Sequence, residues 1–538
     1  MTSVLITGVC VTAMTYCIYL AVFRKRHAHN LPPGPRGLPI LGNMRDFPPG
    51  GRPEYQHWIA HKDLYGPVSS VRVLGQTIVL VHDRDAAHEL LTRTSSKSSD
   101  RPTSEFATNL CGYGRLFVLR GDDARFRRCR KMVHQHLGTA ASASRFDEAQ
   151  DAATRRYLLQ VLNSPNSLFR HLANHAGGSV LRITYGYATS SAAEADPLIE
   201  LIELSVSQLG LAIVPGAWAV DVVPALKYLP AWCPGAGFQQ TARRFGKVAQ
   251  QMASVPFEFV LGRMASGTQR ESFVSRLVAQ HREAAPGGTL TPRDEDEIKT
   301  TAAVMYLGGS DTIVTALRVF VLCMILFPGV QRRAQEEIDS VLGPRRLPAA
   351  SDRHRLPYVD ALVKEAYRWS PAVPLGLAHA TSEEAVCGGY RIPKGAIIMP
   401  AVWWFLHDPD VYPRPGDFDP ERFLEPRNER DPRLDAFGYG RRLCPGRYVA
   451  DTILYLTFAQ TLAAFDIGKA VDGQGKEIDV ELELGCGVAC FPKEFPYAIA
   501  PRSPAHADMI RRMDAGRLGE ATDLDCLDIR AMMRKWDD

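Results

Sequence analysis

A long uncharged run of mostly apolar residues opens this chain. Residues 4–23 carry no charged side chain, and three basic residues follow at 24–26. A run of this length suffices for a helix to cross a bilayer, and positive flanking charge stays on the cytosolic side. The pattern predicts a membrane anchor helix at 1–23, with the remaining chain in the cytosol. A cleaved signal peptide fits less well, because the charges follow the run and no small-residue cleavage site ends it.

Prolines stiffen the chain after the predicted anchor. Residues 31–35 read Leu-Pro-Pro-Gly-Pro, and each proline fixes its own φ and restrains the residue before it. We expect residues 24–40 to form a basic, proline-rich hinge that holds the folded body away from the membrane surface.

The periodicity of the following segments predicts mixed structure and then mainly helices. Apolar and polar residues alternate at 68–82 around a central glycine, which predicts a β-hairpin. Asp83 follows, in a position to cap a short helix. A basic helix is predicted at 121–137, and residues 142–290 read as mainly helical. No Gly/Ser linker, low-complexity segment or internal repeat divides the chain, so we expect residues 41–501 to form one large domain.

The longest predicted helix starts at Pro292, with Thr291 as its cap, and runs to about residue 327. Acidic residues fill its first turns, where the helix dipole favours negative charge. Asp311 and Arg318 lie in its second half and argue against a second membrane span.

A pair of glycines, Gly308 and Gly309, occupies the middle of that helix. Two glycines cost helix stability and allow another group to approach the backbone. Asp311 and Thr312 follow the glycines directly, and a carboxylate beside a hydroxyl suits proton delivery. The alternative is a kinked, buried helix with a satisfied polar pair.

Composition excludes some classes of protein. The 538 residues include 63 basic and 59 acidic side chains, a formal charge of +4, which is too balanced to suggest nucleic-acid binding. The eleven cysteines are scattered without a Cys-x-x-Cys pair. An odd number without a disulfide framework fits a reducing compartment better than secretion.

One cysteine stands in a distinctive segment. Residues 437–446 read Phe-Gly-Tyr-Gly-Arg-Arg-Leu-Cys-Pro-Gly. We expect the first two glycines to bring backbone N–H groups near the sulfur of Cys444, Phe437 to cover one side and Arg442 to supply a cation. With Pro445 as the first residue of a helix, Cys444 would cap the positive end of that helix. A buried free cysteine is the alternative, but five fitting positions favour a thiolate ligand of haem iron.

This segment resembles the haem-binding signature of the cytochrome P450 family, Phe-x-x-Gly-x-Arg-x-Cys-x-Gly, with every defining position filled. The resemblance extends over residues 31–501, because three further motifs follow the family's order. It implies a mainly α fold with a small β region, in which haem b lies between the long central helix and the cysteine loop. The thiolate of Cys444 would be the axial ligand of the iron, and Arg442, Phe437 and Gly309 would contact the cofactor.

The resemblance also implies roles for polar residues. In the family, the Ala/Gly-Gly-x-Asp/Glu-Thr motif delivers protons during oxygen activation, which assigns Asp311 and Thr312 as catalytic. Arg130 and His379 match positions that bond haem propionates, although a lone histidine in an apolar run is otherwise a core residue. Phe126 stands where the family usually has tryptophan. Phenylalanine cannot donate a hydrogen bond, so one propionate contact should be missing.

Further basic and acidic residues receive roles outside the chemistry. Glu365 and Arg368 lie three apart, and a downstream Pro-Glu-Arg-Phe supplies Arg422. In the family these three form a buried triad, which we assign to holding the cysteine loop; an ordinary surface pair is the alternative. Three basic residues of the 121–137 helix are expected to face an acidic electron donor: Arg127, Arg128 and Lys131.

Two apolar segments are expected to line a substrate cavity, a strand at 372–380 and a second wall at 484–491. The side chains expected to line this cavity are Val373, Leu375, Leu377 and Val488. The segment 214–238 is apolar and aromatic and contains four prolines. In the family such a region roofs the cavity and dips into the membrane surface; a buried loop is the alternative. The aromatic residues that would suit the interface are Trp218, Tyr228 and Trp232.

The resemblance implies a monooxygenase that inserts one oxygen atom from O2 into a lipophilic small molecule. No flavin or nicotinamide domain is attached, so electrons would come from a separate NADPH–cytochrome P450 reductase at the endoplasmic reticulum membrane. In the general character of its sequence, the chain resembles fungal, especially basidiomycete, members of the family that act in secondary metabolism. This resemblance favours a terpenoid or polyketide intermediate as substrate. A haem-thiolate isomerase or dehydratase without a reductase, or a non-enzymatic haem sensor, is the alternative. The sequence assigns no function to the extension at 502–538.

Overall fold

The computed structural model describes most of the chain beyond the N-terminal segment. The described residues are 30–39, 41–189, 196–214, 216–230, 232–285, 287–344, 346–485, 487–514 and 522–523. The predicted anchor at 1–23 lies outside them. The chain divides into two compact units. The first comprises Met1–Pro102, Leu375–Phe405 and Gly438–Leu443, and the second comprises Thr103–Pro374, Leu406–Phe437 and Cys444–Asp538.

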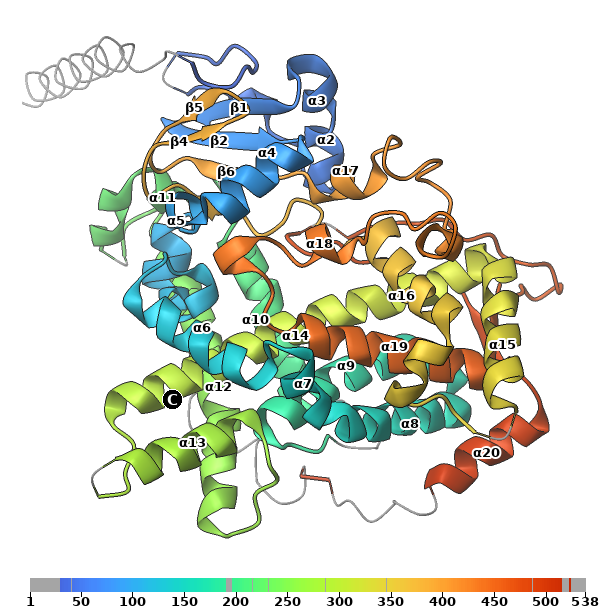
Figure 1. Ribbon diagram of the computed structural model, residues 1–538. Coiled ribbons are helices and arrows are strands. Elements are labelled where there is room, and N and C mark those ends of the chain that lie inside the picture. The colour runs from blue at the N-terminus through green and yellow to red at the C-terminus, as the bar shows by residue number, and fades with distance from the viewer. Residues whose placement is uncertain are drawn as a thin grey trace, which may run out of the picture. The chain divides into compact units, whose positions relative to one another are not determined.

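The first unit is built around a four-stranded sheet with the order β1-β2-β6-β3. Strands β2 and β6 are parallel, and the other neighbours are antiparallel. Figure 1 shows α2 and α3 beside this sheet. The strands of the unit are β1 (Val68–Val73), β2 (Gln76–Val81), β3 (His379–Ala380), β4 (Ala385–Cys387), β5 (Tyr390–Ile392) and β6 (Ile397–Pro400). Its helices are α2 (Glu54–Trp58), α3 (Ala60–Tyr65), α4 (Arg84–His88) and α5 (Ser95–Ser98).

The predicted hairpin at 68–82 is confirmed. Val68 pairs with Val81 at its open end, and the turn between β1 and β2 contains Leu74 and Gly75, both at positive φ. One face of the sheet buries Val71, Ile78 and Leu80 against Trp58. The carboxylate of Asp83 accepts a hydrogen bond from the Ala86 N–H, so the predicted helix cap is confirmed as well.

The proline-rich segment is bonded to the sheet along part of its length. The Ser70 hydroxyl donates to the Pro32 carbonyl at 2.7 Å, and the Ser70 N–H donates to the Pro33 carbonyl at 2.8 Å. A Cβ on Gly34 would lie 1.8 Å from the Ser70 carbonyl oxygen, so only glycine fits there. Residues 32–34 are therefore part of the folded unit and do not form a free spacer.

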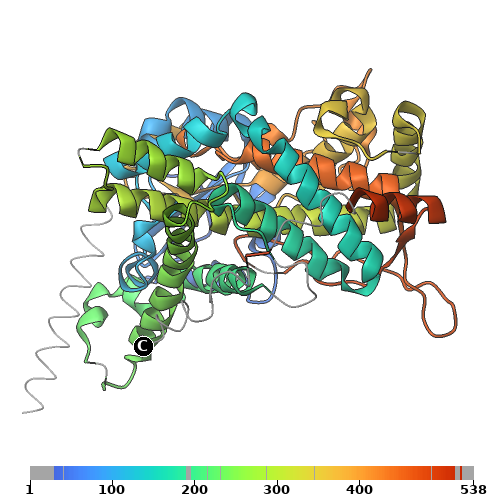
Figure 2. The ribbon, with the colours of Figure 1, turned by 90° about the horizontal axis from the view of Figure 1, so that it is seen from below.

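The second unit is mainly helical. Figure 1 shows α9, α14 and α19 running through its middle, and Figure 2 shows α8 and α9 side by side. Its longer helices are α6 (Ala124–Leu137), α8 (Asp147–Asn163), α9 (Leu168–Tyr185), α10 (Pro197–Ala212), α12 (Gly237–Ala265), α13 (Phe273–Ala284), α14 (Pro292–Leu326), α15 (Pro328–Leu342), α16 (Pro357–Trp369), α19 (Arg447–Ala464) and α20 (Pro504–Asp514). The unit also contains α7 (Ala140–Ala143), α11 (Ala219–Val222), α18 (Arg433–Ala436), β7 (Phe465–Gly468) and β8 (Ala498–Pro501), and α17 (Val402–His407) spans the boundary between the units.

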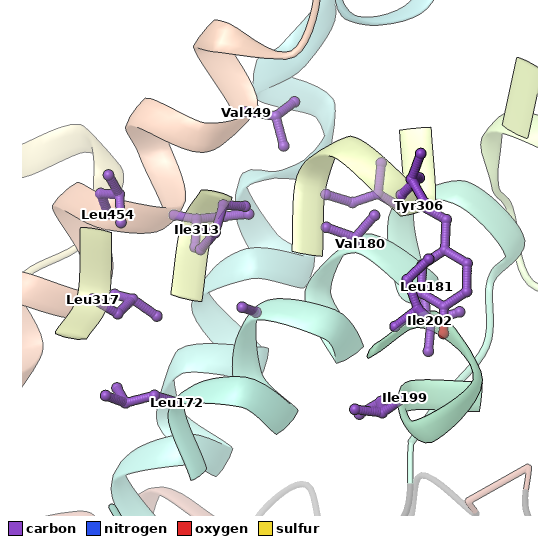
Figure 3. Packing of buried hydrophobic residues seen from close by; sticks show 14 of the residues in the cluster. Leu172, Val180, Leu181, Ile199, Ile202, Tyr306, Ile313, Leu317, Val449 and Leu454 are labelled. Atoms are coloured by element: carbon purple, nitrogen blue, oxygen red, sulfur yellow. The ribbon is translucent and has the colours of Figure 1, made fainter. Parts of the chain in front are cut away.

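The core of the second unit surrounds α14. Apolar side chains of α9 and α19 pack against it, and Figure 3 shows Leu172, Val180, Ile313 and Leu317 in this cluster. The rings of Phe320 on α14 and Phe458 on α19 stack at 4.1 Å. Burying large apolar side chains from several helices on α14 fixes its position within the unit.

The long helix α14 has the predicted ends. The Thr291 hydroxyl accepts from the Asp294 N–H, Pro292 is the first helical residue and Phe327 is the C-cap. Among the described residues, α14 alone is long and apolar enough to cross a membrane. Because 67% of its most apolar window is buried inside the protein, it is a core helix, as Asp311 and Arg318 had indicated.

The predicted fold class, mainly α with a small β region, is confirmed. The strand predicted at 372–380 is wrong over most of its length, because only His379–Ala380 pairs with β6. Gly376 has a φ of +60°, and a Cβ there would lie 2.9 Å from Pro400 Cγ. The backbone turns at 374–376 and cannot continue as a strand.

Candidate functional site

The loop before Cys444 closes on itself through the backbone. The Cys444 N–H donates to the Phe437 carbonyl at 2.8 Å, and the Phe437 ring lies 5.1 Å from that of Tyr367 on α16. In the first unit, Gly438 and Gly440 adopt positive φ. A Cβ on Gly440 would meet the Leu91 carbonyl oxygen at 2.3 Å, so glycine is required there.

Helix α19 begins later than predicted. Arg447 is its first residue and Gly446 its N-cap, whereas Pro445 lies in the preceding turn. The sulfur of Cys444 accepts hydrogen bonds from the N–H groups of Gly446 and Arg447. These two N–H groups stand at the start of α19 and carry the positive end of its dipole. The N–H donors predicted from the upstream glycines stay a prediction.

Opposing effects act on the thiol of Cys444. Burial raises its pKa, whereas the two backbone N–H groups and the positive charges of Arg130 and Arg447 lower it. The residue is only half-buried overall. A thiol with donors and cations on the protein side is suited to become a thiolate when a metal cation supplies the missing charge.

Helix α6 places two of the predicted residues. Phe126 is 3% exposed and its ring lies 6.3 Å from that of Phe117, so it packs in the core. Burial lowers the pKa of Arg130, and the negative charge of a Cys444 thiolate raises it. The structure thus brings Arg130 to the cysteine and leaves Phe126 as a packing residue.

The remaining basic residues of α6 are largely engaged within the chain. Arg127 donates to the Asp122 carboxylate at 2.9 Å. Arg128 forms a bidentate ion pair with Glu297, near the start of α14. Arg128 therefore already has an acidic partner within the chain, while Lys131 lies exposed on the same helix. That these residues face an electron donor stays a prediction.

In the first unit, Arg442 and His379 lie near a second arginine, Arg101. Arg442 is 8% exposed, and its Nε donates to the Ser99 carbonyl at 2.7 Å. Arg101 donates to the carbonyls of Leu377 and Ala378 at 2.6 and 2.7 Å. The charges of Arg101 and Arg442 both act on His379. Sequence reasoning missed Arg101, because its contacts join residues 276 and 277 positions apart.

The ring of His379 has a defined tautomer. Its Nδ1 lies 2.8 Å from the Ser98 carbonyl oxygen, which only accepts, so Nδ1 carries the proton. Burial and the two arginines hold the pKa of His379 well below its usual range. The neutral ring then has no proton on Nε2 to donate. Nε2 can donate a hydrogen bond to a carboxylate only when the ring is protonated and positively charged. The positive charges of Arg101 and Arg442 oppose that protonation.

The two adjacent glycines of α14 have different surroundings. A Cβ on Gly309 would lie 2.9 Å from Val180 Cγ2, so Gly309 permits close packing against α9. A Cβ on Gly308 would meet nothing within 4 Å, and Gly308 is exposed in the middle of a core helix. The open space beside the helix therefore lies at Gly308, and the cofactor contact of Gly309 stays a prediction. The Thr312 hydroxyl donates to the Gly308 carbonyl at 2.8 Å.

Asp311 lies among other charges. Burial raises its pKa, and Arg318, two turns along α14, lowers it. The Arg318 guanidinium is 4.0 Å from Glu494 and donates to the Pro492 carbonyl at 3.3 Å. Asp311 is thus a carboxyl with a raised pKa, next to the Thr312 hydroxyl in sequence, which suits proton supply.

Glu365, Arg368 and Arg422 form a fully buried ion-pair network. Arg368 donates to both Glu365 oxygens at 2.7 and 2.8 Å, and Arg422 lies 3.3 Å from the same carboxylate. Each of the three side chains is 0% exposed. Arg368 also donates to the carbonyls of Pro415 and Asp417, so the network ties α16 to the chain that precedes the cysteine loop.

The residues predicted to line a cavity fall in two places. Val373 belongs to the second unit, and Leu375 and Leu377 belong to the first. Val488 is 40% exposed at the tip of the 484–492 loop, whose base is closed by the bridge of Leu484 with Pro492.

Comparisons with known proteins give a consistent result. A family model described as cytochrome P450 matches residues 32–494. Cytochrome P450 monooxygenase CLM2 of Gibberella zeae is 45% identical over 498 residues, 92% of this chain and 94% of that protein. The multifunctional cytochrome P450 monooxygenase af510 of Aspergillus fumigatus is 45% identical over 95% of this chain and 96% of its own length. O-methylsterigmatocystin oxidoreductase of Aspergillus flavus is 38% identical over 92% of both chains.

Proposed function

The chain belongs to the cytochrome P450 family, and we propose that it is a monooxygenase whose haem is bound through the thiolate of Cys444. Membership confirms the resemblance stated from the sequence, and with it the haem cofactor with a cysteine thiolate ligand that the family uses. One observation carries the assignment of the ligand. The sulfur of Cys444 accepts two N–H groups at the start of α19, beside Arg130 and Arg447.

In the second unit, Cys444 and Arg130 would hold the haem. In the first unit, Arg442 and Arg101 lie near one another as two cations. These cations match the anionic propionates in charge. When bound, the haem supplies the oxidising chemistry, and electron density from the thiolate favours O–O cleavage.

Asp311 and Thr312 are proposed to supply protons. The Thr312 hydroxyl donates to the Gly308 carbonyl and keeps its lone pairs for a water molecule. Burial raises the pKa of Asp311, so this carboxyl holds its proton to a higher pH than an exposed aspartate does. The pair can therefore pass a proton from the carboxyl to the hydroxyl through water.

The reaction consumes O2 and NADPH. One oxygen atom enters a C–H bond of the substrate and the other leaves as water, with two electrons from NADPH and two protons closing the balance. The electrons are proposed to come from a separate NADPH–cytochrome P450 reductase that approaches α6, where Lys131 is exposed and the side chain of Arg127 is 64% exposed.

The substrate is proposed to be a lipophilic intermediate of fungal secondary metabolism, a terpenoid or a polyketide. The relatives that support this are fungal monooxygenases, and the name of one of them identifies O-methylsterigmatocystin as its substrate. The long helix that carries the catalytic pair is mostly apolar, which fits an apolar substrate.

The protein is proposed to sit on the endoplasmic reticulum membrane with its catalytic body in the cytosol. Tyr228 and Trp232 are 79% and 83% exposed in the apolar 214–238 segment, as interfacial aromatic residues would be. Trp218 is different from the prediction, because its ring stacks on Phe106 at 3.6 Å and lies 8° from parallel. Two aromatic anchors therefore remain in this segment, in addition to the predicted helix at 1–23.

Product formation tests the proposed function. Full-length haem-loaded protein in vesicles with reductase should convert a lipophilic candidate to a product carrying one oxygen atom from labelled O2, only when NADPH is present. A haem-thiolate isomerase or dehydratase would form product without NADPH or reductase. A haem sensor would bind the candidate, shift its spectrum and form no product. Either outcome would contradict the proposed function.

A further inference from the structure

The described part of the C-terminal extension contains a deeply buried carboxylate. Asp523 is 1% exposed, although aspartate side chains are almost never fully buried without partners. It follows helix α20, beyond the residues that the family model matches. The extension is therefore attached to the second unit at this residue.

Three groups hold the Asp523 carboxylate. Arg263 pairs with Oδ1, Arg270 donates to Oδ2 at 2.5 Å, and the Ala188 N–H donates to Oδ2 at 2.8 Å. In return, the Asp523 N–H donates to the Ala188 carbonyl at 3.0 Å. The arginine side chains are 20% and 23% exposed. We call Arg263, Arg270 and Ala188 the carboxylate socket.

The socket is assembled from separate elements and is preorganised. Arg263 lies in the last turn of α12, and Arg270 lies in the connection to α13. Arg270 also donates to the Gly186 carbonyl at 3.3 Å. Gly186 ends α9 at a φ of +70°, and a Cβ there would lie 2.9 Å from the Arg270 carbonyl oxygen. The backbone at Gly186 therefore lies close to the backbone at Arg270. Arg263, Arg270 and the Ala188 N–H all contact the Asp523 carboxylate.

The geometry points to a C-terminal strap: we propose that the extension binds the carboxylate socket through Asp523 and fastens residues 186–189 to the end of α12. An exposed ion pair is worth little, but this carboxylate is buried, and removing its charge takes away the negative group that both arginines share. Next to the socket, the Tyr187 hydroxyl donates to Asp196, which caps α10. The strap therefore contacts residues next to Tyr187, which is itself bonded to the cap of α10.

The test uses the full-length, haem-loaded protein and needs no substrate. Asp523→Asn removes the charge and keeps the size of the side chain. Asp525→Asn is the matched control, because it removes the same charge two positions further along the extension. Amide hydrogen exchange of residues 183–189 and 259–272 is followed together with the rate at which trypsin cleavage after Arg517 releases residues 518–538.

Asp523→Asn should raise the release rate and the exchange of the Ala188 amide by at least about tenfold, because a buried ion pair is broken. Asp525→Asn should match the wild-type protein. Arg270→Gln tests the same contact from the other side if Asp523→Asn does not fold. The double variant should be no faster than either single variant. Rates for Asp523→Asn and Arg270→Gln equal to wild type, or single effects that add in the double variant, would overturn the proposal.

Discussion

The hydroxyl of Thr312 donates a hydrogen bond to the carbonyl of Gly308, 2.8 Å away and one turn earlier in α14. Gly308 is exposed in a helix that is otherwise largely buried. The bond occupies the hydroxyl proton and leaves both lone pairs available. This relationship places the Thr312 hydroxyl beside Gly308, an exposed residue in the middle of the core helix.

Thr312→Ala should uncouple the reaction while sparing the fold. The variant should bind haem and substrate normally but form less product and more peroxide per NADPH consumed, because the proton relay is cut. Thr312→Ser should restore coupling. Thr315 makes the same type of bond, to the Asp311 carbonyl at 3.0 Å, and is fully buried; Thr315→Ala is therefore the matched control and should leave coupling unchanged. Equal coupling in all variants would refute the catalytic role.

Asp311 should give the coupling a pH dependence. Burial raises its pKa, so the folded protein holds this proton at pH values where the unfolded chain has lost it. Stability therefore falls as pH rises through that window. The supply of protons falls in the same direction, so product per NADPH should decline with rising pH. Asp311→Asn should lower coupling and flatten both profiles, and an unchanged profile would show that another group titrates.

The buried network should be needed for folding and not for chemistry. Glu365→Gln leaves the charges of Arg368 and Arg422 unpaired, at a cost of about 3–5 kcal/mol in the free energy of unfolding. Urea unfolding of the haem-loaded protein measures this cost. Glu384→Gln is the control, because Glu384 pairs with Arg391 and both side chains are more than half exposed, so its cost should stay below about 1 kcal/mol. A small cost for Glu365→Gln would mean that the network does not hold the loop.

Binding of the reductase should depend on the exposed positive charge of α6. Lys131→Glu should raise the concentration of reductase needed for half-maximal turnover, and added salt should weaken the difference. Lys394 is equally a surface lysine but lies in the turn between β5 and β6. Lys394→Glu should therefore leave the reductase dependence unchanged. Equal effects of the two substitutions would indicate a general charge effect and not a docking site.

The features that the sequence predicted correctly depend on local chemistry. The ends of α14 follow from Thr291 and Pro292, and the β1–β2 hairpin follows from strict alternation around a glycine turn. The cysteine loop was recognised because its signature is continuous in the chain. Each of these features is specified by residues that are neighbours in sequence.

The features that the sequence did not predict depend on contacts between distant residues. The turn at Gly376 is imposed by the close approach of Pro400, which ends the strand predicted at 372–380. The contacts of Arg101 join residues 276 and 277 positions apart. The Asp523 contacts with Arg263 and Arg270 span 260 and 253 positions. A single sequence carries no local signal for such pairings.

The absorption spectrum of the reduced, carbon monoxide-bound protein tests the identity of the iron ligand most directly. Wild-type protein should give the long-wavelength Soret band of a thiolate-ligated haem, and Cys444→Ala should lose both that band and all turnover. Cys233 is also a half-buried free cysteine, so Cys233→Ala is the matched control and should keep the band. A wild-type protein that is active but shows only the shorter-wavelength band of histidine-ligated haem would contradict the account, as would a Cys444→Ala variant that keeps the thiolate band.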